Sequence, residues 1–310
     1  MNLIKLFLLI SFLFVGCLAK QEIIIDGTKL VFPPFITAET KIEEIYASPR
    51  LFEAPVWDRI NNKLYFTGYE KGKEMLMKFI ATGKAEDVPL SQGTGGTIIG
   101  PDPKFLYTAN GETHEIIKFK LYGDEWKHPE VLAKDNSWFQ PNDLCQTING
   151  DIYFTDPDFK NKKDGAVYHL SKSGKVTKVI SDLPVPNGII SSNDGKKIYV
   201  SDSFLKEWRV YQVGKDGMLD KGTLFFKPSA VSKNNPDGMT IDVKGNIYCT
   251  GLGGICIVTP KGKAIGFIPV PEVCTNIAFG GNEYTTLYIS CYKKVYSFKT
   301  NIKGFVPSKK

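Results

Sequence analysis

The stretch Asn149-Gly150-Asp151-Ile152-Tyr153-Phe154-Thr155 joins a turn to a short strand that carries a tyrosine. Five other stretches repeat this order, and the six shared tyrosines are Tyr65, Tyr107, Tyr153, Tyr199, Tyr248 and Tyr288. They are separated by 42, 46, 46, 49 and 40 residues. A repeat of this length is typical of a unit of four short strands.

Each unit has the pattern of consecutive hairpins. Alternating β-branched and aromatic residues are broken by turn residues, as in Gly165–Leu170 followed by Ser173–Val179. No extended helical periodicity follows residue 19. The sequence therefore predicts an all-β fold, a six-bladed β-propeller, with a solenoid or two β-sandwiches as alternatives. Two strand-like stretches, Glu22–Ile25 and Ile42–Ile45, are expected to complete the last blade and close the ring.

The composition is that of a chain with a large folded core. The 310 residues are 42% hydrophobic and 23% charged, with a net charge of +6. The positive charges are scattered among acidic ones, so we expect no nucleic-acid partner. The pattern does not indicate an oligomeric state.

Residues 1–19 have the pattern of a secretory signal peptide. A lysine precedes an apolar stretch from Leu6 to Gly16, and small residues end at Ala19. This stretch is too short for a transmembrane helix, and no later one is longer. We expect a signal peptide over 1–19, a single propeller domain over 20–310, and a secreted or periplasmic protein. Lipidation and membrane tethering at Cys17 is the alternative.

Removing that segment leaves five cysteines without CxxC spacing, so neither a zinc ribbon nor a thioredoxin-type site is indicated. Cys249 and Cys256 flank a Gly-rich turn and would face each other across two strands. A disulfide between them and two buried thiols are both open interpretations.

In a propeller, the loop that enters the innermost strand of each blade points into the central channel. These positions lie about a dozen residues before the shared tyrosines. They are Glu53, Gly95 or Gly96, Asn142, Asn187, Asp237 and Asn276. Three of them directly follow a proline, which fixes the backbone of the loop.

Carboxylates and amide oxygens that converge on one axis repel one another unless a cation neutralises them. Oxygen-only ligation favours Ca²⁺, then Mg²⁺ or Mn²⁺, over Zn²⁺. Turn formation alone is the alternative for the Asn and Asp residues, but Glu53 is not a turn former. The sequence predicts that a divalent metal ion binds among these axial residues.

Five short motifs occur in a specific order and spacing. They are Glu53-Ala54-Pro55-Val56-Trp57, Pro141-Asn142-Asp143, Pro186-Asn187-Gly188, Asn235-Pro236-Asp237-Gly238-Met239 and Thr275-Asn276-Ile277-Ala278-Phe279. With them, roughly Glu44 to Lys299 resembles the SMP-30/gluconolactonase/LRE-like family, which includes gluconolactonases and regucalcin. The gluconolactonase branch is the more similar one.

This resemblance implies a six-bladed propeller that hydrolyses sugar lactones to aldonic acids. It implies one catalytic divalent metal ion held by Glu53, Asn187 and Asp237, with Asn142 as a further ligand or a substrate contact. The chain departs from the family pattern at Ala54, where Gly is usual, at Gly95, where Asn is common, and at Asp156–Phe159.

For such a reaction the ion would polarise the lactone carbonyl and lower the pKa of a bound water. Asp237 is the candidate general base, and Glu53 is the second candidate catalytic residue. Asn142, Trp138 and His114 are the candidate substrate contacts. A Ser-His-Asp triad is not indicated, because the chain has three histidines and no GxSxG sequence.

Two other functions stay open at this point. The same metal site could polarise a P=O group, as in a phosphotriester or organophosphate hydrolase. The protein could also be a non-catalytic propeller that binds calcium or a partner.

Overall fold

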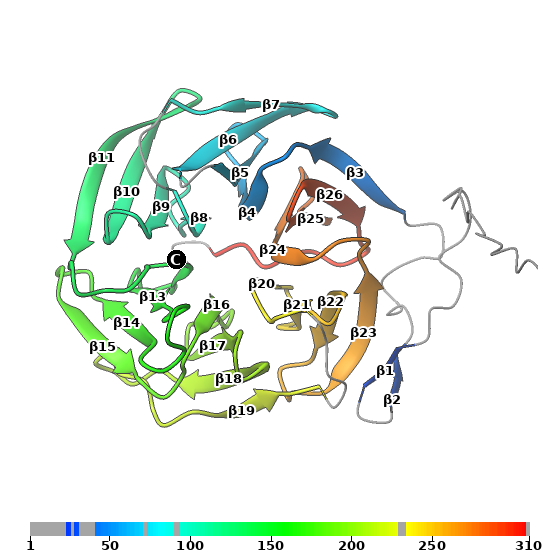
Figure 1. The fold of residues 1–310 in the computed structure, drawn as a ribbon. Coiled ribbons are helices and arrows are strands. Elements are labelled where there is room, and N and C mark those ends of the chain that lie inside the picture. The colour runs from blue at the N-terminus through cyan, green and yellow to red at the C-terminus, as the bar shows by residue number, and fades with distance from the viewer. Residues whose placement is uncertain are drawn as a thin grey trace, which may run out of the picture.

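The computed structural model describes residues 23–25, 28–30, 41–70, 73–89, 94–228 and 234–307. The predicted signal segment, including Cys17, lies outside these residues. All regular elements among the described residues are strands, and these form six four-stranded antiparallel sheets and one separate hairpin. No helix in this part of the chain is long and apolar enough to cross a bilayer. The sheets surround a central channel (Figure 1), so the prediction of an all-β, six-bladed propeller is confirmed.

The first three blades follow the chain from the innermost strand outward. Blade 1 contains β4 (Leu51–Asp58), β5 (Lys63–Glu70), β6 (Lys73–Ala81) and β7 (Lys84–Asp87). Blade 2 contains β8 (Thr97–Ile99), β9 (Phe105–Asn110), β10 (Glu115–Tyr122) and β11 (Glu125–Lys134). Blade 3 contains β12 (Leu144–Gln146), β13 (Ile152–Asp156), β14 (Ala166–Leu170) and β15 (Val176–Ile180).

The remaining blades continue this order, except that an N-terminal strand completes the last one. Blade 4 contains β16 (Pro186–Ser191), β17 (Lys197–Asp202), β18 (Glu207–Gln212) and β19 (Thr223–Phe226). Blade 5 contains β20 (Met239–Ile241), β21 (Ile247–Gly251), β22 (Gly254–Val258) and β23 (Ala264–Pro269). Blade 6 contains β24 (Cys274–Gly280), β25 (Thr286–Cys291), β26 (Lys294–Lys299) and β3 (Ile42–Ala47).

The ring closes through β3, which pairs with β26 as the outer strand of blade 6. The prediction for the stretch at Ile42 is therefore confirmed. The prediction for the stretch before it is wrong, because β1 (Ile23–Ile25) pairs with β2 (Thr28–Leu30) in a separate hairpin. β3 supplies the fourth strand of blade 6, and β1 belongs to none of the six blades.

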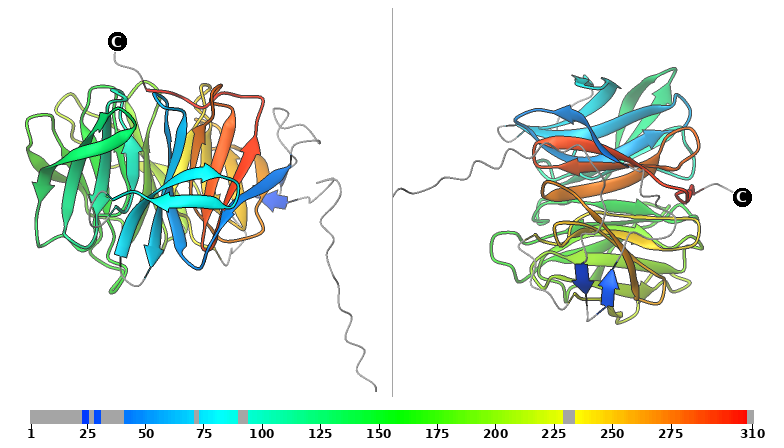
Figure 2. Two further views of the ribbon diagram at one scale, coloured as in Figure 1. Left: turned by 90° about the horizontal axis from the view of Figure 1, so that it is seen from above. Right: turned by 90° about the vertical axis from the view of Figure 1, so that its right-hand side faces the viewer.

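Figure 2 shows the blades side by side around the ring. The buried hydrophobic side chains form separate clusters between neighbouring blades, such as blades 5 and 6 and blades 1 and 2. Tyr65 of blade 1 meets Trp126 of blade 2 edge to face, with ring centroids 6.3 Å apart. Across the closure, Trp57 of blade 1 stacks on Tyr288 of blade 6 at 5.7 Å. The repeated tyrosines on the second strands thus hold the blades together.

The predicted facing of Cys249 and Cys256 is confirmed, since they are cross-strand partners in β21 and β22. Both side chains are buried, and the structure contains them as free thiols. Whether they form a disulfide stays open.

Candidate functional site

Each innermost strand begins at one end of the central channel, which we call the polar end. Backbone contacts between neighbouring blades define equivalent positions there. The Gly96 N–H donates to the Asn142 carbonyl at 2.7 Å, and the Gly238 N–H donates to the Thr275 carbonyl at 2.8 Å. By this register the six axial positions are Glu53, Gly95, Asn142, Asn187, Asp237 and Thr275. Five agree with the sequence prediction, and the sixth is Thr275 rather than Asn276.

A small residue follows several axial residues because the next blade lies directly against it. A β-carbon placed on Gly188 would lie 2.2 Å from the Asp237 carbonyl oxygen. One on Gly238 would lie 2.0 Å from the Asn276 side-chain oxygen. No real β-carbon fits at such distances, so glycine allows the blades to meet at the axis.

Glu53 lies at a β-bulge, where the register of β4 against β5 shifts between Glu53 and Val56. Ala54 next to it has a φ of 42°, in the left-handed region. The Ala54 N–H donates to the Glu53 carboxylate at 3.4 Å. A bulge of this kind redirects a side chain at the end of a strand, and here it places a carboxylate beside the channel axis.

Asp143 and Asn276 occupy equivalent positions one residue after the axial ones. In each case the side-chain oxygen accepts the next backbone N–H at 2.8 Å, from Leu144 and Ile277 respectively. The Asn276 side chain also hydrogen-bonds the Asp143 carboxyl and the Glu53 carboxyl. Asn276 is therefore a bridge between two carboxyl groups of the site.

Three carboxyl groups influence one another at this end of the channel. Burial, followed by the neighbouring Asp143, raises the pKa of Glu53 to about 8. Burial raises the pKa of Asp143 to about 7. Burial and the charge of Glu53 also raise the pKa of Asp237 well above its usual range. No lysine or arginine of the described residues is among the main causes of these shifts. The site thus concentrates negative charge without a protein cation to balance it.

The orientation of Asn187 is fixed by hydrogen bonding. Its side-chain Nδ2 donates to Ser203 Oγ at 3.1 Å, and Ser203 Oγ donates to the Pro236 carbonyl at 2.6 Å. Because the amide nitrogen is engaged by Ser203, the amide oxygen is the group left for the channel.

The residues present fit a divalent cation of the hard type. Glu53 and Asp237 would supply carboxylate oxygens, and Asn142 and Asn187 would supply amide oxygens. Among the described residues, no group of three or more His, Cys, Asp or Glu side chains is arranged to hold an ion. A cation at this ring would therefore depend on the asparagines as well as the carboxylates, and the four-residue ligand set stays a prediction.

The other two candidate substrate contacts lie near the loop that enters blade 3. Trp138 is buried and packs edge to face on Phe154, with ring centroids 4.9 Å apart. His114 is half-buried in the turn between β9 and β10. The Asp156 carboxylate accepts the backbone N–H groups of Phe139 and Gln140 at 3.1 and 2.7 Å. Trp138 thus shapes this loop from within the core, and both assignments as substrate contacts stay predictions.

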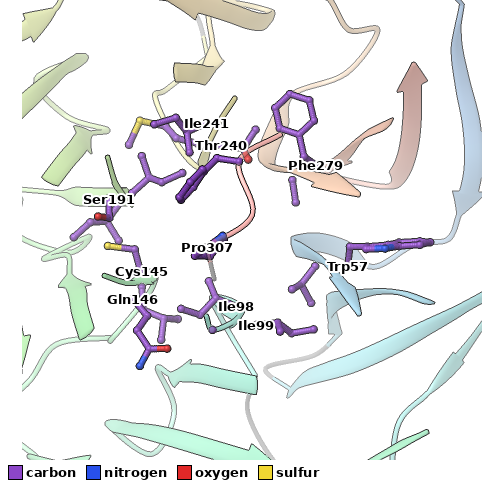
Figure 3. Close-up of a pocket in the computed structure, with 18 of the residues that line it drawn as sticks. Trp57, Ile98, Ile99, Cys145, Gln146, Ser191, Thr240, Ile241, Phe279 and Pro307 are labelled. Carbon is purple, nitrogen blue, oxygen red and sulfur yellow. The ribbon is translucent and has the colours of Figure 1, made fainter. Parts of the chain in front are cut away.

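Below the ring, the channel is a cavity of about 190 Å³. Asp143 and Asn276 belong to its lining, which otherwise consists mainly of apolar residues from the later parts of the innermost strands. Its other end, which we call the apolar end, contains Phe305 and Pro307. In Figure 3, Pro307 lies among Cys145, Ile98 and Ile99 of the channel wall.

Comparison with known proteins agrees with this geometry. Residues 51–293 match the sequence profile of the SMP-30/Gluconolactonase/LRE-like region. The chain belongs to this family. It is 30% identical over 303 residues to a gluconolactonase from Zymomonas mobilis, which covers 87% of the chain and 84% of that protein. It is 26% identical over 249 residues to the pentonolactonase XacC of Haloferax volcanii, covering 78% and 82% of the two chains.

A solved structure shows the same fold. A gluconolactonase from Xanthomonas campestris superimposes with a TM-score of 0.72 at 22% identity, covering 86% of this chain and 94% of the other. At this identity the likeness concerns the propeller alone.

In this SMP-30/gluconolactonase-type propeller, the sequence reasoning missed two polar residues at the ring. In the sequence, Asp143 stands out only because it follows Asn142. Glu74 lies on β6, the third strand of blade 1, outside the repeated axial position. The repeat identifies the residue that begins each innermost strand. It carries no signal for a side chain that reaches the ring from another strand or from the next position.

Proposed function

We propose that this protein is a metal-dependent hydrolase of sugar lactones, similar to gluconolactonases, that opens a lactone to the aldonic acid. The observation that carries the proposal is the ring formed by Glu53, Asn142, Asn187 and Asp237, in which coupled carboxyl groups have no cationic partner among the described residues. The named activities of the relatives in Zymomonas mobilis and Haloferax volcanii support the same reaction class.

In this proposal Glu53 and Asn187 hold the cation, and Asn142 binds it or orients the lactone. A bound divalent ion, with Ca²⁺ favoured by the oxygen-only donors, supplies Lewis acidity towards the carbonyl and lowers the pKa of water. Asp237 takes a proton from the water whose oxygen adds to the lactone carbonyl. The ring C–O bond then breaks, and the departing oxygen receives a proton and becomes a hydroxyl group of the aldonic acid.

We further propose that the mature protein begins after Ala19 and acts outside the cytoplasm. The lysine, apolar stretch and small residues of 1–19 support this location. N-terminal sequencing of the protein released by its native host tests it. A blocked N-terminus at Cys17 in a membrane fraction would favour the lipoprotein route instead.

The activity is tested with glucono-1,5-lactone and protein that has been stripped of metal by a chelator. We expect acid release above the uncatalysed rate only after Ca²⁺, Mg²⁺, Mn²⁺ or Zn²⁺ is restored. Equal activity with and without metal would contradict metal dependence. A folded protein that binds Ca²⁺ but opens no lactone would contradict the proposed reaction.

A further inference from the structure

The ring at the polar end has one position without a side chain. Gly95 occupies the axial position of blade 2, equivalent by backbone contacts to Asn187 and Asp237. Among the described residues, blade 2 therefore provides no side chain at this axial position.

A carboxyl group from blade 1 occupies that empty place. A β-carbon placed on Gly95 would lie 3.3 Å from Oε2 of Glu74. Glu74 comes from the beginning of β6, so its side chain reaches across to where a residue-95 side chain would project. This position is the reason that we assign Glu74 to the ring although it lies outside the repeat pattern.

The two carboxylate oxygens of Glu74 differ in their hydrogen bonding. Its cross-strand partner Tyr69 donates its hydroxyl hydrogen to Glu74 Oε1. Within the part of the chain that the structure describes, Oε2 has no hydrogen-bond partner, and Glu74 is only 2% exposed. Burial raises the pKa of Glu74 to about 7, Glu112 adds to the rise, and no lysine or arginine of the described residues opposes it. A buried acceptor left unpaired is costly, so a donor from a bound ligand would relieve this cost.

The surroundings favour a hydroxyl group over a second cation as that donor. Two backbone oxygens, those of Ala109 and Asn142, lie close to where a β-carbon on Gly95 would be. They already accept the N–H groups of Gly95 and Gly96 at 3.0 and 2.7 Å. A Ca²⁺ ion needs about six to eight oxygen ligands, whereas one hydroxyl group needs a single acceptor. Only one carboxylate oxygen of Glu74 is free, which matches the smaller requirement.

We propose that Glu74, held by Tyr69, is a specificity-determining residue that accepts a hydrogen bond from a hydroxyl group of a polyhydroxylated lactone. This proposal rests on the lactonase activity proposed above and narrows its substrate class. A site built to bond a hydroxyl group discriminates strongly against the analogue that lacks it. Lactones without ring hydroxyl groups would therefore gain nothing from Glu74.

The test compares glucono-1,5-lactone with δ-valerolactone, which has the same ring without hydroxyl substituents, in the metal-loaded protein. For Glu74→Gln we expect kcat/KM for glucono-1,5-lactone to fall by about 10- to 100-fold. Hydrolysis of δ-valerolactone should stay within about twofold, as expected for loss of a contact that only the hydroxylated ring makes. Tyr69→Phe should shift selectivity in the same direction and serves if Glu74→Gln does not fold. Glu86→Gln, an exposed glutamate on β7 of the same blade, is the matched control.

Inhibition constants for gluconate give a second measure of the contact with Glu74, and they do not require turnover of δ-valerolactone. We expect Glu74→Gln to weaken gluconate binding and leave inhibition by 5-hydroxypentanoate unchanged. Equal losses for both lactones and both inhibitors, or no loss for any, would overturn the proposal. So would two bound Ca²⁺ ions in the wild type and one in Glu74→Gln, which would make Glu74 a cation ligand. Failure of the proposed function has a different signature: the wild type itself would open no lactone.

Discussion

The two ends of the central channel are built by the same six strands but differ in chemistry. At the polar end Glu53, Asn142, Asn187 and Asp237 lie within or just before the first residues of the innermost strands. The carboxyl groups there raise one another's pKa values. At the apolar end the channel is lined mainly by hydrophobic side chains and contains Phe305 and Pro307 of the C-terminal segment. One end concentrates unfavourable charge, and the other buries apolar surface.

The C-terminal segment joins several blades at the apolar end. The Phe305 N–H donates to the Ile241 carbonyl at 2.9 Å in blade 5, and the Gly304 N–H donates to the Tyr284 carbonyl at 2.8 Å in blade 6. Arg59, which follows β4 of blade 1, donates to the Pro307 carbonyl at 3.5 Å. Stability added here can offset the cost of clustering carboxylates at the other end, a division commonly found between scaffold and functional site.

The largest effect is expected at the polar end. Asp237→Asn removes the carboxylate that we propose holds the cation and accepts the proton, so kcat/KM for glucono-1,5-lactone should fall by about 10³-fold. Initial-rate measurements with saturating metal test this, with Asp124→Asn, an exposed carboxylate paired with Lys63, as the control. Retention of more than about a tenth of the activity would remove Asp237 from its proposed role.

Changes at the apolar end should affect stability rather than chemistry. Removing residues 302–310 deletes the buried Ile302 and the backbone hydrogen bonds of the C-terminal segment. The free energy of unfolding should fall by about 3 kcal/mol. Denaturant unfolding measures this, and kcat/KM of the folded protein should change by less than about threefold.

Lys303→Ala, which alters an exposed side chain on the same segment, is the control for the truncation. A truncated protein of normal stability that had lost activity would show that the two ends are not separable in this way.

The sequence predicted the ring of blades because each blade repeats one buried tyrosine on its second strand, as at Tyr153 and Tyr248. The same repeat located Glu53, Asn187 and Asp237, which lie 11 or 12 residues before that tyrosine. In blade 6 this count points to Asn276 instead of Thr275. In each blade the axial residue lies three positions before the residue that pairs with the tyrosine, as with Thr240 opposite Tyr248 and Ala278 opposite Tyr288. The connection between β24 and β25 is longer than its equivalents in the other blades, and this changes the count.

Contacts between blades could not be predicted from the repeat. Glu74 lies beside the place where a β-carbon on Gly95 would be. Asn276 of blade 6 hydrogen-bonds Glu53 of blade 1 and also Asp143, which directly precedes β12 of blade 3. Such groupings join residues of different blades, so the sequence of a single repeat does not predict them. The C-terminal segment likewise lies outside the repeat, and its place in the channel follows from the structure alone.

The polar end should make the metal-free protein less stable as the pH rises. The pKa values of Glu53 and Asp143 are raised to about 8 and about 7 in the folded chain. The folded state therefore holds protons that the unfolded state has lost, from about pH 4 upward, and stability falls until these groups ionise near pH 8. Between pH 5 and pH 8 the free energy of unfolding should fall by about 6 kcal/mol.

Thermal unfolding in the presence of a chelator tests this dependence, and added Ca²⁺ should raise the melting temperature more at pH 8 than at pH 5. Asp143→Asn should flatten the profile, because it removes one of the coupled carboxyl groups. A metal-free protein that becomes more stable from pH 5 to pH 8 would contradict the electrostatic account of the polar end.

The smallest effect is expected one step away from the ring. Ser203→Ala removes the hydroxyl that accepts from Asn187 Nδ2 and donates to the Pro236 carbonyl, so the Asn187 amide can rotate away from the channel. Ca²⁺ affinity should fall about tenfold, as is usual when a residue that orients a ligand is lost. Calorimetric titration measures this, with the exposed Ser173→Ala as the control. Because Asn187 keeps its place on β16, excess Ca²⁺ should restore kcat to near the wild-type value. A loss of kcat that no Ca²⁺ concentration reverses would mean that Ser203 acts on the reaction itself.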